Sequence, residues 1–245
     1  MVGMIDPPLD SENDFTDRLT NMSMLRWTVA QVKGRRTYTS PLRDNQVRAT
    51  RQAILGAARE LFVAQGYGAT TVDQIAQRAG VSKPTVFTAV GNKQTVLRAV
   101  RDVAIAGDDE PVPVAQRPLV DRVRAAPDQR RAVALMAAHL TAVAGRYAEI
   151  NEVVHTAADG GDEGLRELWT TEEEQRLTGA RLWLELLTDK GGLRKGVAPA
   201  EAVDELWLLM SPDQYYRLVH RRGWSPRRYE RWLTRAIGRL LLPES

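Results

Sequence analysis

The sequence predicts a protein built only of α-helices. Apolar side chains recur every three or four positions through most of the chain after residue 47, which is the spacing of a helix with one buried face. No segment combines alternating apolar residues with β-branched enrichment and paired turn signals, as strands and hairpins require. Residues that favour helix starts precede the apolar stretches: Thr71, Ser82, Asn92, Ser211 and Ser225.

The composition excludes several classes of protein. A chain of 245 residues with 43% hydrophobic content can bury a sizeable core. The absence of cysteine excludes disulfides, thiolate zinc sites and a catalytic cysteine. No apolar run approaches the roughly eighteen residues of a transmembrane helix. The first twenty residues hold five acids and one arginine, unlike a secretory signal. We therefore expect a cytoplasmic protein with no membrane association.

The net charge of +3 is unevenly distributed along the chain. Residues 1–46 are neutral overall, residues 47–102 carry a net charge of +5, and residues 103–245 carry −2. A basic span beside a near-neutral remainder indicates a local surface for a polyanion such as DNA.

The first 46 residues precede the periodic pattern. Residues 1–32 are polar and aperiodic, so we expect a disordered extension. The native protein could also begin later, since Met4, Met22 and Met24 are alternative starts. Residues 33–46 form a basic arm. Its arginines either lie in a DNA minor groove or are solvated: Arg35, Arg36 and Arg43.

The span 47–102 contains four predicted helices. The first carries apolar residues at helical spacing from Ile54 to Phe62 and ends at Gly66. The second begins with a Thr71-x-x-Gln74 capping box, and Gly80 is placed to end it.

The third helix, about 83–90, begins after the candidate N-cap Ser82 with Pro84 in its first turn. Asn92 caps the fourth, whose inward face includes Val96 and Val100. That helix fades into an expected domain boundary that begins at Gly107.

Two short helices joined by a three-residue turn, inside the basic span, form a helix-turn-helix pattern. The third helix is short enough to enter a major groove, where its outward side chains contact bases or phosphates. The positive end of the second helix suits a phosphate. The candidate DNA-binding residues are Arg48, Thr71, Lys83, Pro84, Thr85, Phe87, Thr88 and Lys93.

Residues 47–102 also resemble a known family through residues at fixed spacing: Ile54, Leu55, Ala57, Ala58, Leu61, Phe62, Gly66, Tyr67, Thr70, Thr71, Val72, Ile75, Ala76, Ala79, Gly80, Val81, Ser82, Lys83, Pro84, Thr85, Val86, Phe87, Asn92 and Lys93. The pattern is similar to the DNA-binding domain of TetR-type transcriptional regulators. The family's usual tyrosine near the end of the recognition helix, a phosphate contact, is Phe87 here, which we expect to pack or stack. The family's later phenylalanine is Val90.

The resemblance implies an all-α architecture, with an N-terminal helix-turn-helix DNA-binding domain at 47–102 and a larger helical effector-binding and dimerisation domain at 103–245. It implies a ligand-responsive regulator, most often a repressor, that acts as a homodimer on a pseudopalindromic double-stranded DNA operator. A small, largely apolar effector is its expected ligand, and no cofactor or metal is expected.

Helical periodicity in the second domain predicts helices at 128–145, 147–158, 164–189, 199–210, 212–221 and 226–241. By resemblance, the last two major helices form the dimer interface, with candidates Leu206, Met210, Tyr229, Trp232, Leu233, Ile237 and Leu240. Candidates for an effector pocket are bulky or polar residues on apolar faces: Met136, His139, Tyr147, Trp169, Trp183 and Trp207, with Arg176 and His155 as polar anchors.

Two alternatives stay open at this point. A helical-bundle metalloenzyme is suggested by the Glu152-x-x-His155 pair, although a di-iron site needs two such motifs and only one is present. Otherwise, no residues suggest catalysis. An architectural DNA-binding protein without an effector needs no large near-neutral second domain, so we favour the ligand-responsive regulator.

Overall fold

The computed structural model describes residues 41–107 and 118–244, and every regular element in these ranges is helical, which confirms the predicted all-α fold there. In chain order the elements are α2 (Pro41–Ala69), α3 (Val72–Ala79), α4 (Lys83–Ala89), α5 (Lys93–Ala106), α6 (Pro118–Arg124), α7 (Gln129–Asp159), α8 (Glu163–Thr188), α9 (Pro199–Leu209), α10 (Pro212–Tyr215), the π-helical stretch η2 (Tyr216–Arg221) and α11 (Pro226–Leu241). None of the described helices is both long and apolar enough to cross a membrane.

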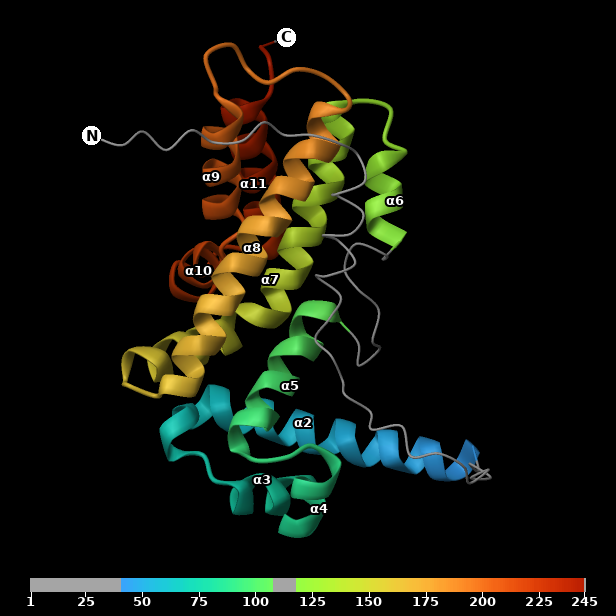
Figure 1. Cartoon of the computed structure of the whole chain (residues 1–245), viewed down its shortest axis with the longest axis vertical. Helices are drawn as coiled ribbons and strands as arrows, with labels where there is room; N and C mark the ends of the chain where they lie inside the picture. The colour runs from blue at the N-terminus through green and yellow to red at the C-terminus, as the bar shows by residue number, and fades with distance from the viewer. Residues whose placement is uncertain (1–40, 108–117, 245) are drawn as a thin grey trace, which may run out of the picture.

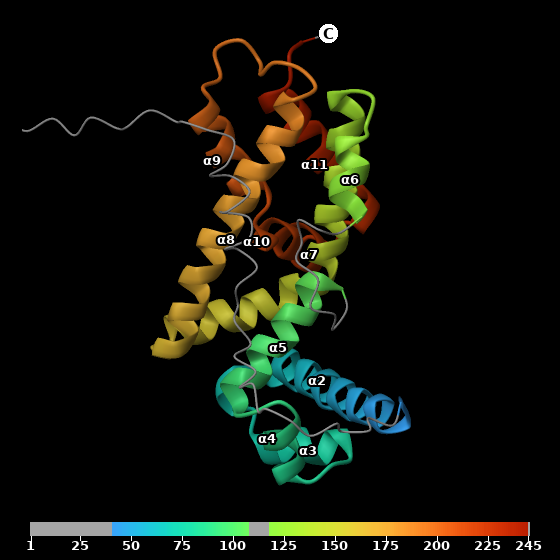
Figure 2. The ribbon, with the colours of Figure 1, turned by 45° about the vertical axis from the view of Figure 1, so that its right-hand side comes forward.

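The helices are arranged as a small head and a longer body (Figure 1). Helices α2–α5 form the head at one end of the molecule, and α6–α11 form the body. Helix α5 leads from the head toward the body and lies against α7, as both ribbon views show (Figure 2).

The capping residues of the head act as predicted. The backbone N–H of Gln74 donates to Thr71 Oγ1 at 3.2 Å, and the Thr71 N–H donates to Gln74 Oε1 at 2.8 Å, which completes the capping box. Ser82 and Asn92 accept from the third residue of α4 and α5, respectively. Gly80 ends α3 in the left-handed conformation, with φ of 68°. Local sequence therefore determines where these short helices begin and end.

Helix α2 differs from its predicted extent. It begins at Pro41, because proline is well suited to a first helical turn. The last six residues of the expected basic arm are therefore helical. The helix is interrupted at Gly66, where φ is 80° and ψ is 169°. The extension 1–32 and the arm residues 33–40, including Arg35 and Arg36, lie outside the described residues.

Helix α7 is continuous, whereas two helices at 128–145 and 147–158 were predicted; that prediction was wrong. Gly145 lies inside it, and a Cβ atom there would come within 3.2 Å of the Tyr215 hydroxyl. The glycine therefore permits close packing of α10 on α7 and does not end the helix. Two other elements were missed: α6, and the π-helical turn of η2 within the helix predicted at 212–221.

Two hydrophobic clusters hold the molecule together. One lies within the body and includes Met136, Leu206 and Leu233. The other joins head and body, because head residues such as Phe62 and Leu97 pack in the same cluster as α7 and α8 residues, which include Ile150, Val154 and Leu165. The head is therefore packed directly on the ends of α7 and α8 that face it.

Replacing Gly66 with alanine should lower the free energy of unfolding by about 1–2 kcal/mol, because an L residue is strained at this positive φ. No atom lies within 4 Å of the position that a Cβ would occupy at Gly66 or at Gly68, so steric clash contributes at neither site. Gly68→Ala is the matched control and should leave stability unchanged or raise it slightly, since its φ is not positive. Urea denaturation of both variants measures the difference. Equal stability of the two variants would contradict the proposed strain.

Candidate nucleic-acid interface

Helices α3 and α4 lie on the side of the head turned away from the body (Figure 1). Val86 is fully buried and anchors α4 in the cluster that joins head and body. The outward face of α4 exposes four of the predicted DNA-binding residues: Lys83, Pro84, Phe87 and Thr88. A short helix held from behind by one core residue can present this face to a major groove.

The threonine hydroxyls of this surface are already engaged in local hydrogen bonds. The hydroxyls of Thr85 and Ser82 are 2.7 Å apart, and Thr88 Oγ1 donates to the carbonyl oxygen of Pro84 at 2.9 Å. Thr71 Oγ1 is bonded to Gln74 in the capping box. Each hydroxyl oxygen keeps a lone pair, so these residues can still accept from a partner.

Lys83 links the two short helices. Its Nζ atom lies 2.8 Å from Asp73 Oδ2 on α3, and at least half of each side chain is exposed. An exposed pair of this kind adds little stability. The ammonium has three N–H donors, so Asp73 holds Lys83 at the surface of α4 while leaving donors for an anion.

Lys93, another predicted DNA contact, is bonded within the head. Its Nζ atom donates to the carbonyl oxygen of Tyr67 at 3.0 Å and lies 4.1 Å from the centre of the Tyr67 ring. The lysine therefore fastens the start of α5 to the chain after Gly66. Arg48, another predicted contact, is exposed near the start of α2.

Two residues of this surface were missed in the sequence. Arg51 Nη1 donates to the carbonyl oxygen of Ala89 at 3.2 Å, and so gives a hydrogen-bond partner to a carbonyl group in the last turn of α4. Asp73 positions Lys83 as described above. Both contacts join different helices, so no local pattern signals them, although an acid within the basic span was visible at position 73.

Phe87 is the exposed apolar residue of α4, with 48% of its surface accessible. A phenyl ring cannot donate a hydrogen bond to phosphate, but it can contact a thymine methyl group. A packing or stacking contact of this outward ring with DNA stays a prediction.

A buried charge network joins the head to the body. Arg101 on α5 lies with Nε 2.7 Å from Glu172 Oε1 on α8, and its Nη2 donates to Gln175 Oε1 at 3.0 Å. Arg101 Nη1 also lies 2.8 Å from Asp102 Oδ1. The Tyr147 hydroxyl on α7 donates to the other oxygen of Glu172. Arg101, Glu172 and Tyr147 are all buried, so three helices meet at one guanidinium–carboxylate contact.

Burial raises the pKa of the Glu172 carboxyl, and the attraction of Arg101 offsets this only in part. Weaker contacts surround the network. Arg59 on α2 pairs with Glu149 on α7 at 3.1 Å, and Arg146 Nε donates to the carbonyl oxygen of Ala104 at 3.0 Å. The end of α7 nearest the head therefore contacts both α2 and α5.

The six predicted effector residues are spread over different parts of the body. Met136 and Trp183 are buried in the body core, where the His139 ring lies 6.2 Å from that of Trp183. Tyr147 belongs to the charge network. The other two, Trp169 and Trp207, contact the predicted anchors: Trp169 lies 4.6 Å from the His155 ring, and Trp207 lies 4.9 Å from the Arg176 guanidinium. Neither cavity described for the structure is lined by any of the six.

The predicted dimer residues fall into two groups. Four of them are buried in the protomer's own core, so they cannot meet a second chain: Leu206, Tyr229, Leu233 and Ile237. Met210 and Trp232 are half-buried, and Leu240 is exposed. Leu208 on α9 is 53% exposed, which the sequence did not predict, because periodicity shows which residues share a face but not what covers that face.

The Glu152 and His155 pair does not gather further ligands. Within residues 41–107 and 118–244, no three His, Cys, Asp or Glu side chains lie close enough to hold a metal ion. His155 instead contacts Trp169 and lies 3.6 Å from Asp159.

Comparison with known sequences gives the same relationship as the motif. Residues 54–100 match the model of the bacterial regulatory proteins, tetR family. The uncharacterized HTH-type transcriptional regulator YdeS of Bacillus subtilis (strain 168) is 34% identical over 171 residues, which are 69% of this chain and 78% of YdeS. The uncharacterized HTH-type transcriptional regulator TtgW of Pseudomonas putida is 47% identical over 55 residues, which are 22% of this chain and 41% of TtgW. The match to TtgW thus spans less than half of that relative.

Solved structures share the fold over most of the chain. NalD, the secondary repressor of the MexAB-OprM multidrug efflux pump in Pseudomonas aeruginosa, has a TM-score of 0.58 at 21% identity, covering 80% of this chain and 98% of NalD. A complex of SmeT with triclosan has a TM-score of 0.59 at 22% identity, covering 78% of this chain and 90% of SmeT. At these identities the likeness concerns the fold alone.

Replacing Arg101 with methionine should destabilise the protein by about 3–5 kcal/mol, because Glu172 stays buried without its cation. The double variant Arg101→Met/Glu172→Leu should recover most of this loss, since it removes both charges. Arg78→Ala is the matched control: it breaks an exposed pair with Glu60 and should cost at most about 1 kcal/mol. Urea denaturation measures all three variants. A cost for Arg101→Met no greater than that of the control would show that the buried pair does not hold the head.

Proposed function

The chain belongs to the tetR family of bacterial regulatory proteins, and we propose that it is a ligand-responsive repressor that binds a pseudopalindromic DNA operator as a homodimer. The observation that carries the proposal is the outward face of α4, which presents Lys83, Phe87 and Thr88 from within the most basic span of the sequence. Its site of action is chromosomal DNA, so we expect it in the cytoplasm.

In this proposal α4 enters the major groove and α3 crosses the adjacent backbone. Lys83 exchanges part of its contact with Asp73 for a phosphate or a base edge, which an exposed ion pair permits at small cost. Thr85 and Phe87 supply contacts that depend on the base sequence. The first backbone N–H groups of α3, beside Thr71, face a phosphate.

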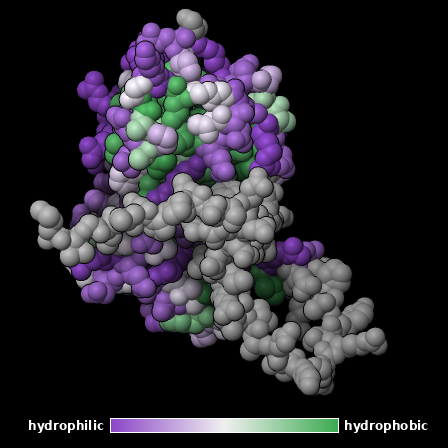
Figure 3. Space-filling model, turned by 45° about the horizontal axis from the view of Figure 1, so that its top comes forward, coloured by the Kyte–Doolittle hydropathy of each residue, from purple (hydrophilic) through white to green (hydrophobic). Residues whose placement is uncertain are grey.

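A dimer is needed because one recognition helix contacts too few base pairs for useful specificity. Two copies related by a twofold axis place their α4 helices in successive major grooves, about 34 Å apart. Apolar residues left accessible on α9 and α11 support an interface there: Leu208, Trp232 and Leu240. Figure 3 shows hydrophobic side chains among hydrophilic ones on the end of the body away from the head. The interface we propose therefore uses the outer edges of the two helices.

Regulation requires an effector that binds the DNA-incompetent arrangement more tightly than the competent one. We expect a small, largely apolar molecule that binds the body. The triclosan complex of SmeT, a protein with the same fold, supports a small-molecule ligand of this kind. The Arg101–Glu172–Tyr147 network is the contact through which a change in α7 or α8 reaches the head.

Lys83→Ala should weaken binding to operator and to unrelated DNA alike and lower the slope of log K against log salt by about one unit, because one phosphate contact is lost. Phe87→Ala should instead change the preferred bases. The matched control Arg122→Ala removes an exposed charge from α6 in the body and should change neither property. Fluorescence anisotropy with labelled duplexes at several salt concentrations measures the effects. An unchanged salt slope in Lys83→Ala would argue against the docking proposed here.

Leu208→Glu should weaken dimerisation by about tenfold or more, since it places a charge in the proposed interface. Val47→Glu is the control, because Val47 is comparably exposed but lies on α2 in the head. Sedimentation velocity over a concentration series separates monomer from dimer, and circular dichroism checks that both variants are folded. Identical dimer constants for the two folded variants would place the interface elsewhere.

A further inference from the structure

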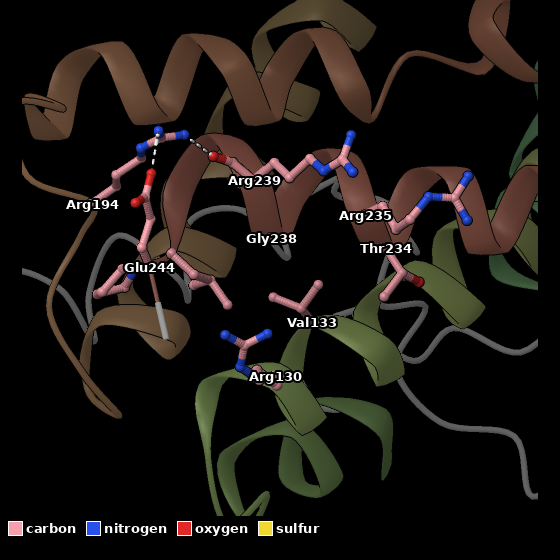
Figure 4. A pocket seen from close by; sticks show the side chains of 10 residues that line it. Arg130, Val133, Arg194, Thr234, Arg235, Gly238, Arg239 and Glu244 are labelled. Atoms are coloured by element: carbon pink, nitrogen blue, oxygen red, sulfur yellow. Dashed lines mark hydrogen bonds and ion pairs between the residues drawn. The ribbon is translucent and has the colours of Figure 1, made fainter.

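Helix α11 carries a row of arginines on the face opposite its buried residues. The helix holds five arginines and one acid, Glu230, although residues 103–245 together carry a net charge of −2. Four exposed arginines recur at helical spacing: Arg228, Arg231, Arg235 and Arg239. In Figure 4 the side chains of Arg235 and Arg239 extend away from Val133 of α7. The outer face of α11 is therefore strongly positive.

The outward face of α9 is acidic instead. Glu201 and Asp204 are exposed on it, and Leu208 follows one turn later. Glu205 is half-buried beside them, and this burial, followed by the charge of Glu201, raises the pKa of its carboxyl. Within residues 41–107 and 118–244, neither these three acids nor the four arginines of the α11 row take part in an ion pair. The protomer therefore leaves both sets of charges uncompensated.

Helices α9 and α11 form one side of the body. Both α7 and α9 contact α8 and α11, so the four helices form a bundle in which α9 and α11 are neighbours. The N–H of Arg194, in the segment before α9, donates to the carbonyl oxygen of Leu241 at 2.8 Å. The start of α9 and the end of α11 therefore lie at the same end of the body, away from the head (Figure 1). The acids in the first turns of α9 are thus level with Arg235 and Arg239 in the last turns of α11.

Symmetry limits how two copies can meet through this side. Both heads of the proposed dimer face the same DNA, so its twofold axis runs along the length of the body. An axis that passes between α9 and α11 places α9 of each copy opposite α11 of the other. An axis that passes over one of these helices places that helix opposite its own copy, and so brings arginines against arginines or acids against acids. Like charges in contact disfavour the second arrangement.

We propose that the dimer pairs α9 of each copy with α11 of the other. The carboxylates of Glu201 and Asp204 then face the last turns of the partner's α11. Arg235 and Arg239 of the partner subunit are their counterions. Leu208 lies on the same face of α9 and supplies an apolar contact between the charged rows. The pairing rests on the proposed homodimer, and it adds which helices meet and which charges select that arrangement.

Charge reversal on either helix tests the pairing. The α11 variant, Arg235→Glu/Arg239→Glu, places acids opposite the acids of α9. The α9 variant, Glu201→Lys/Asp204→Lys, places bases opposite the arginines of α11. Each variant alone should weaken homodimerisation by about tenfold or more at low salt, because both symmetric contacts become repulsive. Sedimentation velocity over a concentration series measures the loss, which should shrink as added salt screens the charges.

A mixture of the two variants tests the same contacts without relying on a loss. Each contact in the mixed dimer joins opposite charges, so the mixed dimer should predominate over both homodimers. Native mass spectrometry separates the three species by mass. The four substitutions combined in one chain should also restore the homodimer to within about threefold of the wild type. Such recovery shows that the single variants are folded and that their charges oppose each other.

Arg122→Glu/Arg131→Glu is the matched control for the α11 variant. It makes the same change in net charge at exposed positions of α6 and α7, and it should change dimerisation less than about twofold. An equal loss in this control would reduce the effect to net charge and overturn the pairing. If the α11 variant dimerised better with the wild-type chain than either did alone, α11 would lie opposite α11, which also contradicts the pairing.

The remaining outcomes separate the pairing from the proposed function. A wild-type chain that stays monomeric would overturn the pairing together with the proposed homodimer. A wild-type dimer that both charge-reversal variants leave intact would overturn the pairing alone, as would the absence of a mixed dimer from two variants that are each weakened.

Discussion

The buried contact between Arg101 and Glu172 constrains the whole molecule. A guanidinium and a carboxylate removed from water must stay partnered, because separating them leaves an uncompensated charge in the interior. Tyr147 adds a hydrogen bond to Glu172 from α7, so α5, α7 and α8 must keep this arrangement for the three groups to stay partnered. Hydrophobic packing around them, which includes Phe62 and Leu165, also stabilises the contact of the head with the body. It is less directional than the charge network. The charge network thus specifies the orientation that the packing stabilises.

The position of the proposed DNA-binding surface depends on this arrangement. Helix α4 is too short to be stable alone and depends on Val86, on its Ser82 cap and on the contact of Arg51 with its last turn. Helix α2, which carries Arg51, packs on α5, and α5 carries Arg101. A displacement of α5 would therefore also move α2 and the outward face of α4.

The sequence was most informative where structure is local. The caps at Thr71, Ser82 and Asn92 and the outward face of α4 follow from residues within four positions of one another, and these were predicted. What was missed depends on distant residues. Nothing near Gly145 indicates that Tyr215 packs against it, and nothing near Lys93 indicates that it fastens Tyr67. Periodicity on α11 identified an apolar face, yet Tyr229 and Leu233 are covered by the protomer itself, because one pattern suits both a core and an interface.

The continuity of α7 through Gly145 gives the body a mechanical property. From its first residue to Tyr147 the helix rises roughly 27 Å, so a rotation of about 5° about its start would displace the contact with the head by roughly 2 Å. A phosphate hydrogen bond tolerates only a few tenths of an ångström. A break in the helix at Gly145 would absorb such a rotation within the body. Because α7 is unbroken between its first turn and Tyr147, such a rotation would reach the head as a linear displacement larger than a phosphate hydrogen bond tolerates.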